Sequence, residues 1–129
     1  MTDRTTTALE VAGDIASHGD GRITLLHVIE TIAGSDVDDE LSTFYTKLEQ
    51  RASRRLTEIL SGVSNKGPID TEIVYGKRVE EVLRFIRANA VDLIVLASHP
   101  VDSSQPYGGL GTMSYKLGIL APCAVLLVK

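Results

Sequence analysis

The stretch that decides the fold is LIVLASHPVDSSQPYGGLGTMSYKLGIL, residues 93–120. It opens with five consecutive apolar residues, continues through a polar segment with three glycines, and ends in a second apolar region. A short, continuous apolar run is typical of a strand covered on both faces, as strands of parallel sheets are. The stretch therefore predicts a strand, a connecting loop and a helix, which together form one unit of an α/β domain.

The rest of the chain repeats this alternation. Further strands are expected at Ile23–Ile29, Ile69–Tyr75 and Cys123–Val128. Apolar residues with helical spacing lie before and between the strands, in stripes that we list here: Ala8, Val11, Ala12, Ile15 and Ala16; Leu41, Phe44, Tyr45, Leu48, Ala52, Ile59 and Val63; Val79, Val82, Leu83 and Ile86; and a short helix over Thr112–Leu120. The order predicts one domain over residues 1–129, a three-layer, doubly wound, mainly parallel sheet with helices on both faces.

Composition narrows the function classes. The 129 residues carry a net charge of −4 without basic blocks, which argues against nucleic-acid binding. No apolar run has the length of a membrane span, and the first residues show no signal pattern, so we expect a cytoplasmic protein without membrane contact. The lone Cys123 excludes an internal disulfide and is expected to be an inert thiol.

Few single residues in the sequence have a clear structural or chemical role. Thr5 or Thr6 is the expected N-cap of the first helix. His27 lies within an apolar run and is expected to be a hydrogen-bonded core residue. The histidines have no metal-ligand spacing, and no catalytic constellation is visible, so neither a metal site nor an enzyme is predicted.

The segment Ser98–Ser114 is the candidate binding site. Ligands of open parallel sheets bind outside the carboxyl ends of the strands, and a helix that begins at Gly111-Thr112 would offer free N–H groups to an anion. However, the stretch from Ser98 to Tyr115 contains no Lys or Arg, and it matches no standard phosphate-loop motif. The residues alone leave two readings open, a phosphate cradle and an ordinary strand-to-helix loop.

Three segments, ITLLHVIE, VDLIVLASHP and GLGTMSYKLGILAPCAVLLVK, together resemble the universal stress protein family. The resemblance implies an adenine nucleotide alpha hydrolase-like fold and a homodimer that acts in stress resistance and regulation. We expect a non-catalytic module. Two alternatives are an ATP-binding switch with slow hydrolysis or autophosphorylation, and an adenylate-handling enzyme on a related fold, against which the missing catalytic constellation argues.

The ATP-binding branch of this family carries the pattern G-x-x-G, nine residues, then G-[S/T]. In this sequence Ala97 and Pro100 replace the first two glycines, ten residues separate Pro100 from Gly111, and Gly111-Thr112 match the final pair. We therefore expect ATP with Mg, or AMP, to bind weakly or not at all. The residues that the resemblance and the loop assign to a nucleotide are Val28, Ala97, His99, Gly109, Gly111, Thr112, Met113 and Ser114.

Two expectations concern the sheet edges. Family members open with a central strand that ends in an Asp, whereas this sequence opens at the first helix, with Asp3 near the matching place. Without that strand, the sheet either closes directly onto Leu93–Ala97 or leaves a weak seam there. Two further possibilities are that a partner supplies the strand and that the gene product starts earlier. At the other edge, the apolar strand Cys123–Val128 is expected to pair with its copy in a homodimer.

Overall fold

The computed structural model describes residues 3–31, 39–63, 68–97 and 113–129. The helices are α1 (Asp3–Ser17), α2 (Asp39–Ser61), α3 (Arg78–Asn89) and α4 (Met113–Leu120), and the strands are β1 (Ile23–Glu30), β2 (Ile69–Gly76), β3 (Leu93–Ala97) and β4 (Ala124–Val128). Helices and strands alternate along the chain as expected. Each strand lies within one residue of its predicted bounds.

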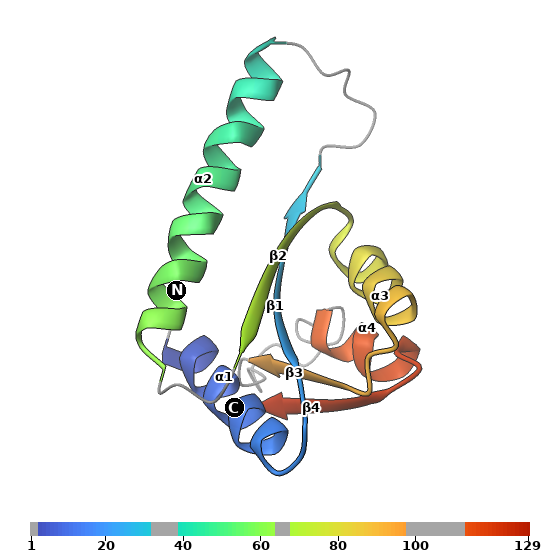
Figure 1. Cartoon of the computed structure of the whole chain (residues 1–129). Coiled ribbons are helices and arrows are strands. Elements are labelled where there is room, and N and C mark those ends of the chain that lie inside the picture. The colour runs from blue at the N-terminus through green and yellow to red at the C-terminus, as the bar shows by residue number, and fades with distance from the viewer. Residues whose placement is uncertain (1–2, 32–38, 64–67, 98–112) are drawn as a thin grey trace, which may run out of the picture.

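The four strands form two separate parallel pairs. β1 pairs with β2, from Ile23 opposite Ile69 to Glu30 opposite Gly76. β3 pairs with β4, from Leu93 opposite Ala124 onward. Within the described ranges no pairing joins β1 to β3, and Figure 1 shows the two pairs running in clearly different directions. Of the two predicted arrangements, the chain therefore has a seam beside β3 and not a closed sheet.

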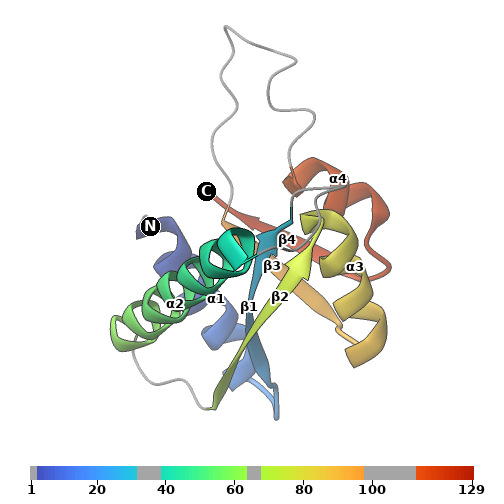
Figure 2. The ribbon, with the colours of Figure 1, turned by 90° about the horizontal axis from the view of Figure 1, so that it is seen from above.

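Helices cover the strands on two sides. α1 and α2 lie on one side, and α3 and α4 lie together on the other (Figures 1 and 2). α1 contacts β1, β3 and β4, so one helix bridges both strand pairs. The predicted three-layer, parallel α/β arrangement is confirmed. No helix within the described part of the chain is long and apolar enough to cross a bilayer.

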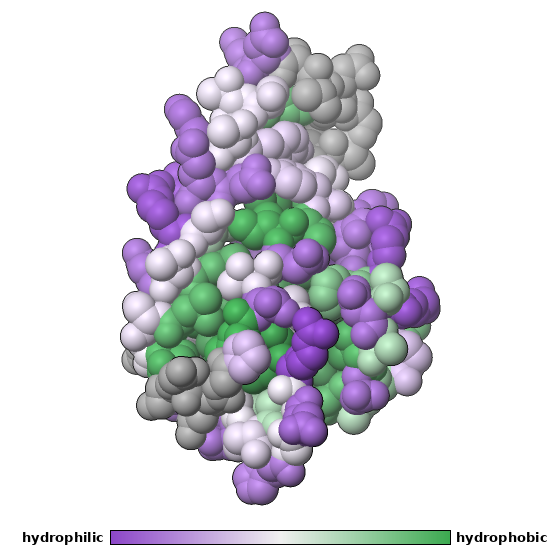
Figure 3. Space-filling model, viewed as in Figure 1, coloured by the Kyte–Doolittle hydropathy of each residue, from purple (hydrophilic) through white to green (hydrophobic). Residues whose placement is uncertain are grey.

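Buried apolar residues lie on both sides of the strands, with one group on α3 and α4 and another on α1 and α2. On the α3 and α4 side, Leu83, Ile86 and Leu117 form a buried cluster, and Leu117 is fully inaccessible. Buried residues of the other two helices are Ala8, Leu9, Ala52, Leu56 and Ile59. Apolar surface nevertheless stays exposed near the middle of the molecule (Figure 3).

Three details of the helices differ from expectation. α1 begins at Asp3, so Thr5 and Thr6 lie inside the helix and the predicted N-cap is wrong. Leu9 is buried in α1, while Ile15 is 46% exposed, because the face that packs on the strands is rotated from the predicted stripe. In α2, Phe44 is 44% exposed because the N-terminal part of the helix extends past the strands (Figure 1).

The buried cluster gives a direct stability test. Replacing Leu117 by Ala leaves a cavity between α3 and α4 and should lower the free energy of unfolding by about 2–5 kcal/mol. Lys116 is on the same helix and is exposed, so Lys116→Ala should change the free energy of unfolding by no more than about 0.5 kcal/mol. Urea unfolding of both variants measures the difference. Equal effects of the two substitutions would contradict the placement of α4.

Candidate functional site

The structure describes half of the predicted nucleotide site. Val28 is buried near the carboxyl end of β1, and Ala97 is the half-buried last residue of β3. Met113 and Ser114 open α4, and both are half-buried. The remaining predicted site residues, His99, Gly109, Gly111 and Thr112, lie outside the described residues. These assignments stay predictions.

The two strand residues of this site belong to different strand pairs. Val28 lies in the β1–β2 pair and Ala97 in the β3–β4 pair. Figure 1 shows β1 and β2 ending at the top of the molecule, whereas β3 and β4 end toward α1. A ligand crevice at a parallel sheet depends on strand ends that share one edge. The described strands do not bring Val28 and Ala97 to such an edge.

The first turn of α4 combines an apolar side chain that packs on the core with polar side chains. The side chain of Met113 packs against the cluster of Leu83, Ile86 and Leu117. Met113 can therefore offer a ligand only its backbone, as the helix N-terminus allows. Ser114 and Tyr115 carry the hydroxyl groups of this turn. The turn can contribute backbone donors and the Ser114 hydroxyl to an anion, and Lys116 at its end carries a positive charge.

A polar cluster lies where β1 and β2 end, and the sequence analysis gave it no role. Glu30 and Arg78 form an ion pair at 3.5 Å, with both side chains about half exposed. The Thr31 N–H donates to the Gly76 carbonyl at 3.4 Å, which holds the two strand ends together. Gly76 has a φ of +147°, and a Cβ there would approach the Glu81 side chain to 2.6 Å, so the turn into α3 requires glycine.

His27 belongs to this cluster and not to the core. His27 is exposed, so the expected hydrogen-bonded core position is wrong. Partial burial of the imidazole, and second the positive charge of Arg78, lower the pKa of His27 below its ordinary value. The sequence does contain a clue to this cluster. His27 and Glu30 lie near the end of the first predicted strand, and Arg78 follows the end of the second.

Aromatic side chains connect α2 to β2 at the same end of the molecule. The Tyr75 hydroxyl donates to Glu49 Oε2 at 2.8 Å, and the rings of Tyr45 and Tyr75 meet edge to face at 6.0 Å. Phe44 extends the contact through Tyr45, with ring centroids 5.8 Å apart. Burial, followed by the hydrogen bond to Glu49 and its charge, raises the pKa of Tyr75. The cluster anchors α2 to β2.

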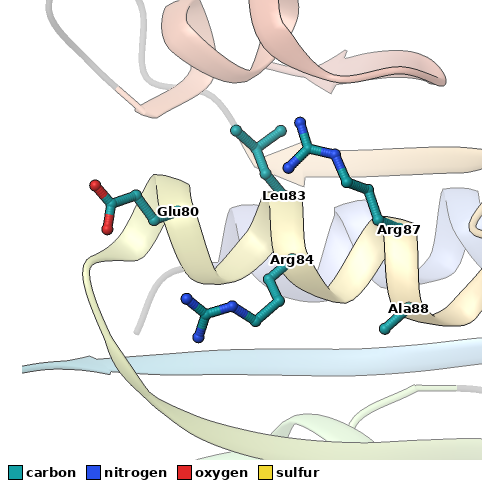
Figure 4. Close-up of a pocket in the computed structure, with 5 residues that line it drawn as sticks. All are labelled: Glu80, Leu83, Arg84, Arg87 and Ala88. Carbon is teal, nitrogen blue, oxygen red and sulfur yellow. The ribbon is translucent and has the colours of Figure 1, made fainter.

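Two open hollows lie on the helices. The larger, of about 550 Å³, lies along α3 and is lined by Glu80, Leu83, Arg84, Arg87 and Ala88 (Figure 4). The smaller, of about 430 Å³, is lined by Gln50, Ser53 and Arg54 of α2. Neither contains a predicted site residue. Among the residues that the structure describes, no three His, Cys, Asp or Glu side chains are placed to hold a metal ion.

Comparison with known proteins identifies the family of this chain. The model of the universal stress protein family matches residues 2–129. The chain belongs to the universal stress protein family. The resemblance of the three sequence segments is therefore confirmed. No protein with a curated description matches the sequence.

Solved structures of universal stress proteins share the fold. UspA from Lactobacillus plantarum is 22% identical with a TM-score of 0.68, and the match covers 99% of this chain and 91% of that one. Hypothetical protein MJ0577 is 23% identical with a TM-score of 0.77, over 95% and 85% of the two chains. A universal stress protein in complex with cAMP is 16% identical with a TM-score of 0.64, over 99% and 90%. At these identities the matches show the fold, the adenine nucleotide alpha hydrolase-like arrangement.

The environment of His27 predicts a pH dependence of stability. Because the folded-state pKa lies below the unfolded value of about 6.5, the unfolded chain binds the proton first as the pH falls. The contribution of His27 is present above this value and is lost as the pH falls from it toward the folded pKa. Urea midpoints from about pH 8 to about pH 5.5 should therefore fall more for the native protein than for His27→Gln. Parallel curves for the two proteins would contradict the assigned environment.

Proposed function

We propose that this universal stress protein is a small, non-catalytic regulatory module of a stress response, which works as a cytoplasmic homodimer and binds nucleotide weakly or not at all. The observation that carries the proposal is the division of Val28 and Ala97 between two strand pairs. A nucleotide held by both would have to span strand ends that point in different directions (Figure 1). If the protein must rearrange before it can bind nucleotide, its apparent affinity falls in proportion to the fraction of molecules in the binding-competent conformation.

The loop sequence supports weak binding independently. Pro100 has no N–H to donate to a phosphate, and Ala97 adds a methyl group where the family pattern has glycine. No Lys or Arg lies between Ser98 and Tyr115, so the charge of a triphosphate would rest on the N-terminus of α4. An exposed helix N-terminus stabilises a nearby negative charge by about 0.3–1 kcal/mol. That contribution is small compared with the roughly 8 kcal/mol of micromolar binding.

The alternative function is a nucleotide-dependent switch. It is favoured by the complex of a structural neighbour with cAMP and by the backbone donors and Ser114 hydroxyl of α4. In this alternative, at least one of cAMP, AMP and Mg-ATP would bind in the low micromolar range.

The proposed dimer interface is the edge formed by β4 and α4. Within the described ranges β4 pairs only with β3, so its other edge has unpaired N–H and C=O groups. The large apolar side chains exposed on these two elements are Tyr115, Ile119, Leu120 and Leu127. An exposed strand edge beside exposed apolar side chains is suited to pair with a second copy about a two-fold axis.

Calorimetric titration decides between the module and the switch. Native protein should show no binding of Mg-ATP, AMP or cAMP tighter than about 0.1 mM, and no phosphate should be released from Mg-ATP. The matched variants are Gly111→Val, which blocks a backbone approach, and Ser114→Ala, which removes the Ser114 hydroxyl. Low-micromolar binding of any of the three nucleotides that Gly111→Val abolishes would overturn the weak-binder proposal and establish the switch.

The dimer is tested on α4, where the side chains are exposed and the fold is least disturbed. Leu120 is 54% exposed, so Leu120→Asp should leave the fold intact and place two buried carboxylates at the interface of the dimer. Its dissociation constant should rise by at least about tenfold, as measured by sedimentation equilibrium. Ala88→Asp, an exposed position on α3, is the matched control and should leave the dimer unchanged. Native protein that sediments as a monomer at micromolar concentration would refute the dimer.

A further inference from the structure

One side of α2 carries charged side chains to which the fold gives no partner. Five exposed residues, spaced alternately four and three apart, lie along this side of the helix: Glu40, Phe44, Lys47, Arg51 and Arg54. Residues at this spacing share one face, because an α-helix has 3.6 residues per turn. Within the described ranges, no ion pair joins any of the four charged side chains to another residue. We call these five residues the α2 stripe.

The α2 stripe is separate from the face of the helix that packs on the strands. α2 contacts β1 and β2, and its buried residues are Ala52, Leu56 and Ile59. Phe44 belongs to the stripe and is 44% exposed, on the part of α2 that extends past the strands (Figure 1). A second helix can therefore reach the stripe without displacing the strands.

Charge is distributed unevenly along the α2 stripe. Its acidic residue, Glu40, lies in the first turn of the helix, and its three basic residues follow after Phe44. Lys47 and Arg51 are four residues apart, and Arg51 and Arg54 are three apart, so like charges are neighbours on the helix surface and destabilise it. A negatively charged partner would offset this repulsion. The surface that complements the stripe has the same charges in the reverse order.

We propose that the α2 stripe binds the α2 stripe of a second copy of the chain, with the two helices antiparallel about a two-fold axis. Reversing the helix reverses the order of the charges, so Glu40 of each copy lies opposite Arg51 of the other. Phe44 then lies opposite Lys47, which allows a cation–π contact. One register satisfies both pairs, because Glu40 precedes Phe44 by as many residues as Lys47 precedes Arg51. The alternating spacing of four and three is that of a seam between two packed helices.

A second copy fits the α2 stripe better than other classes of partner do. The phosphates of a nucleic acid would meet the three cations, and they would also meet the carboxylate of Glu40. A bilayer surface requires an apolar helix face, and α2 places its apolar face against the strands. An acidic polypeptide would leave Glu40 without a partner, whereas the α2 helix of a copy supplies both signs of charge.

The expected contact is weak and sensitive to salt. Ion pairs between exposed side chains contribute little individually, and salt screens them over a Debye length of about 10 Å at 0.1 M ionic strength. The α2 contact does not depend on the proposed function, since it uses none of the residues of the β4 and α4 interface. Where that interface also forms, pairing through α2 would join dimers into larger assemblies at low ionic strength.

The test uses the full chain with Leu120→Asp, which disrupts the separate contact proposed at β4 and α4. Sedimentation equilibrium of this parent at low salt should show a monomer–dimer equilibrium with a Kd of about 0.1 mM or below. Glu40→Arg and Arg51→Glu should each raise the Kd by at least about tenfold, because each places like charges opposite one another. The two substitutions change the net charge in opposite directions, so an effect of net charge cannot explain both.

Arg87→Glu is the matched control for Arg51→Glu. Arg87 is exposed on α3, and its substitution makes the same change of charge outside the α2 stripe. It should alter the Kd by less than about twofold, as expected for a charge that faces solvent in the dimer. Raising the salt concentration to about 0.5 M should weaken the association of the parent, because it shortens the range of the charge pairs.

An equimolar mixture of the Glu40→Arg and Arg51→Glu variants is the decisive measurement. In a mixed dimer the introduced arginine of one chain lies opposite the introduced glutamate of the other. The native Arg51 and Glu40 also face each other in this dimer. The mixture should therefore associate with a Kd within about threefold of the parent value, although each variant alone stays largely monomeric. Far-ultraviolet circular dichroism of each variant checks that the helices are retained.

Three results would overturn the proposal. A parent that stays monomeric at about 1 mM protein would show that the stripe does not bind a second copy. A loss of association with Arg87→Glu as large as that with Arg51→Glu would mean general repulsion between acidic chains. A mixture that stays monomeric, with the circular dichroism of both variants unchanged, would exclude the antiparallel pairing of Glu40 with Arg51. Because the parent carries Leu120→Asp, none of these results bears on the proposed dimer through β4 and α4.

Discussion

Backbone pairing between strands is the constraint on which the rest of this molecule depends. Each described strand has one neighbour, so the layer between the helices consists of two parallel pairs. Short pairs of strands are marginally stable by themselves, and they persist here because helices pack on both sides. α1 contacts strands of both pairs and thus joins the two halves. The buried cluster of Leu83, Ile86 and Leu117 stabilises the half that contains α4.

The divided strand layer also determines what the site can do. Members of this fold class bind ligands where strand ends converge on one edge. Here the β1–β2 end carries the Glu30–Arg78 ion pair and His27, while the β3 end leads toward α1. The charged groups of the described strand ends therefore belong to the β1–β2 pair, whereas Ala97 belongs to the β3–β4 pair. This separation is the physical basis for proposing a regulatory module and not a nucleotide-driven switch.

Much of the fold could be predicted from the sequence, because it is encoded locally. Continuous runs such as LIVLA predicted strands to within one residue, and helical spacing predicted the four helices. Which strands pair with each other could not be predicted. The sequences of β1 and β3 are apolar runs, and they would be the same whether these strands were neighbours or not. The burial of single residues was also difficult: Ile15 and His27 have the composition of core positions, and their exposure depends on how the helix and the strand pack in the folded chain. Of the predicted nucleotide-binding residues, the structure places Val28 and Ala97 in different strand pairs, which no local pattern indicates.

The most direct test of the divided sheet is a set of backbone amide distances in solution. Nuclear Overhauser effects between amide protons on neighbouring strands report which strands are adjacent. Our account predicts cross-strand effects that link Val28 with the Val74 region and Val95 with the Leu126 region, and none that link β1 directly to β3. A ladder of effects between β1 and β3 would show one continuous sheet, and it would contradict both the seam and the functions that we derive from it.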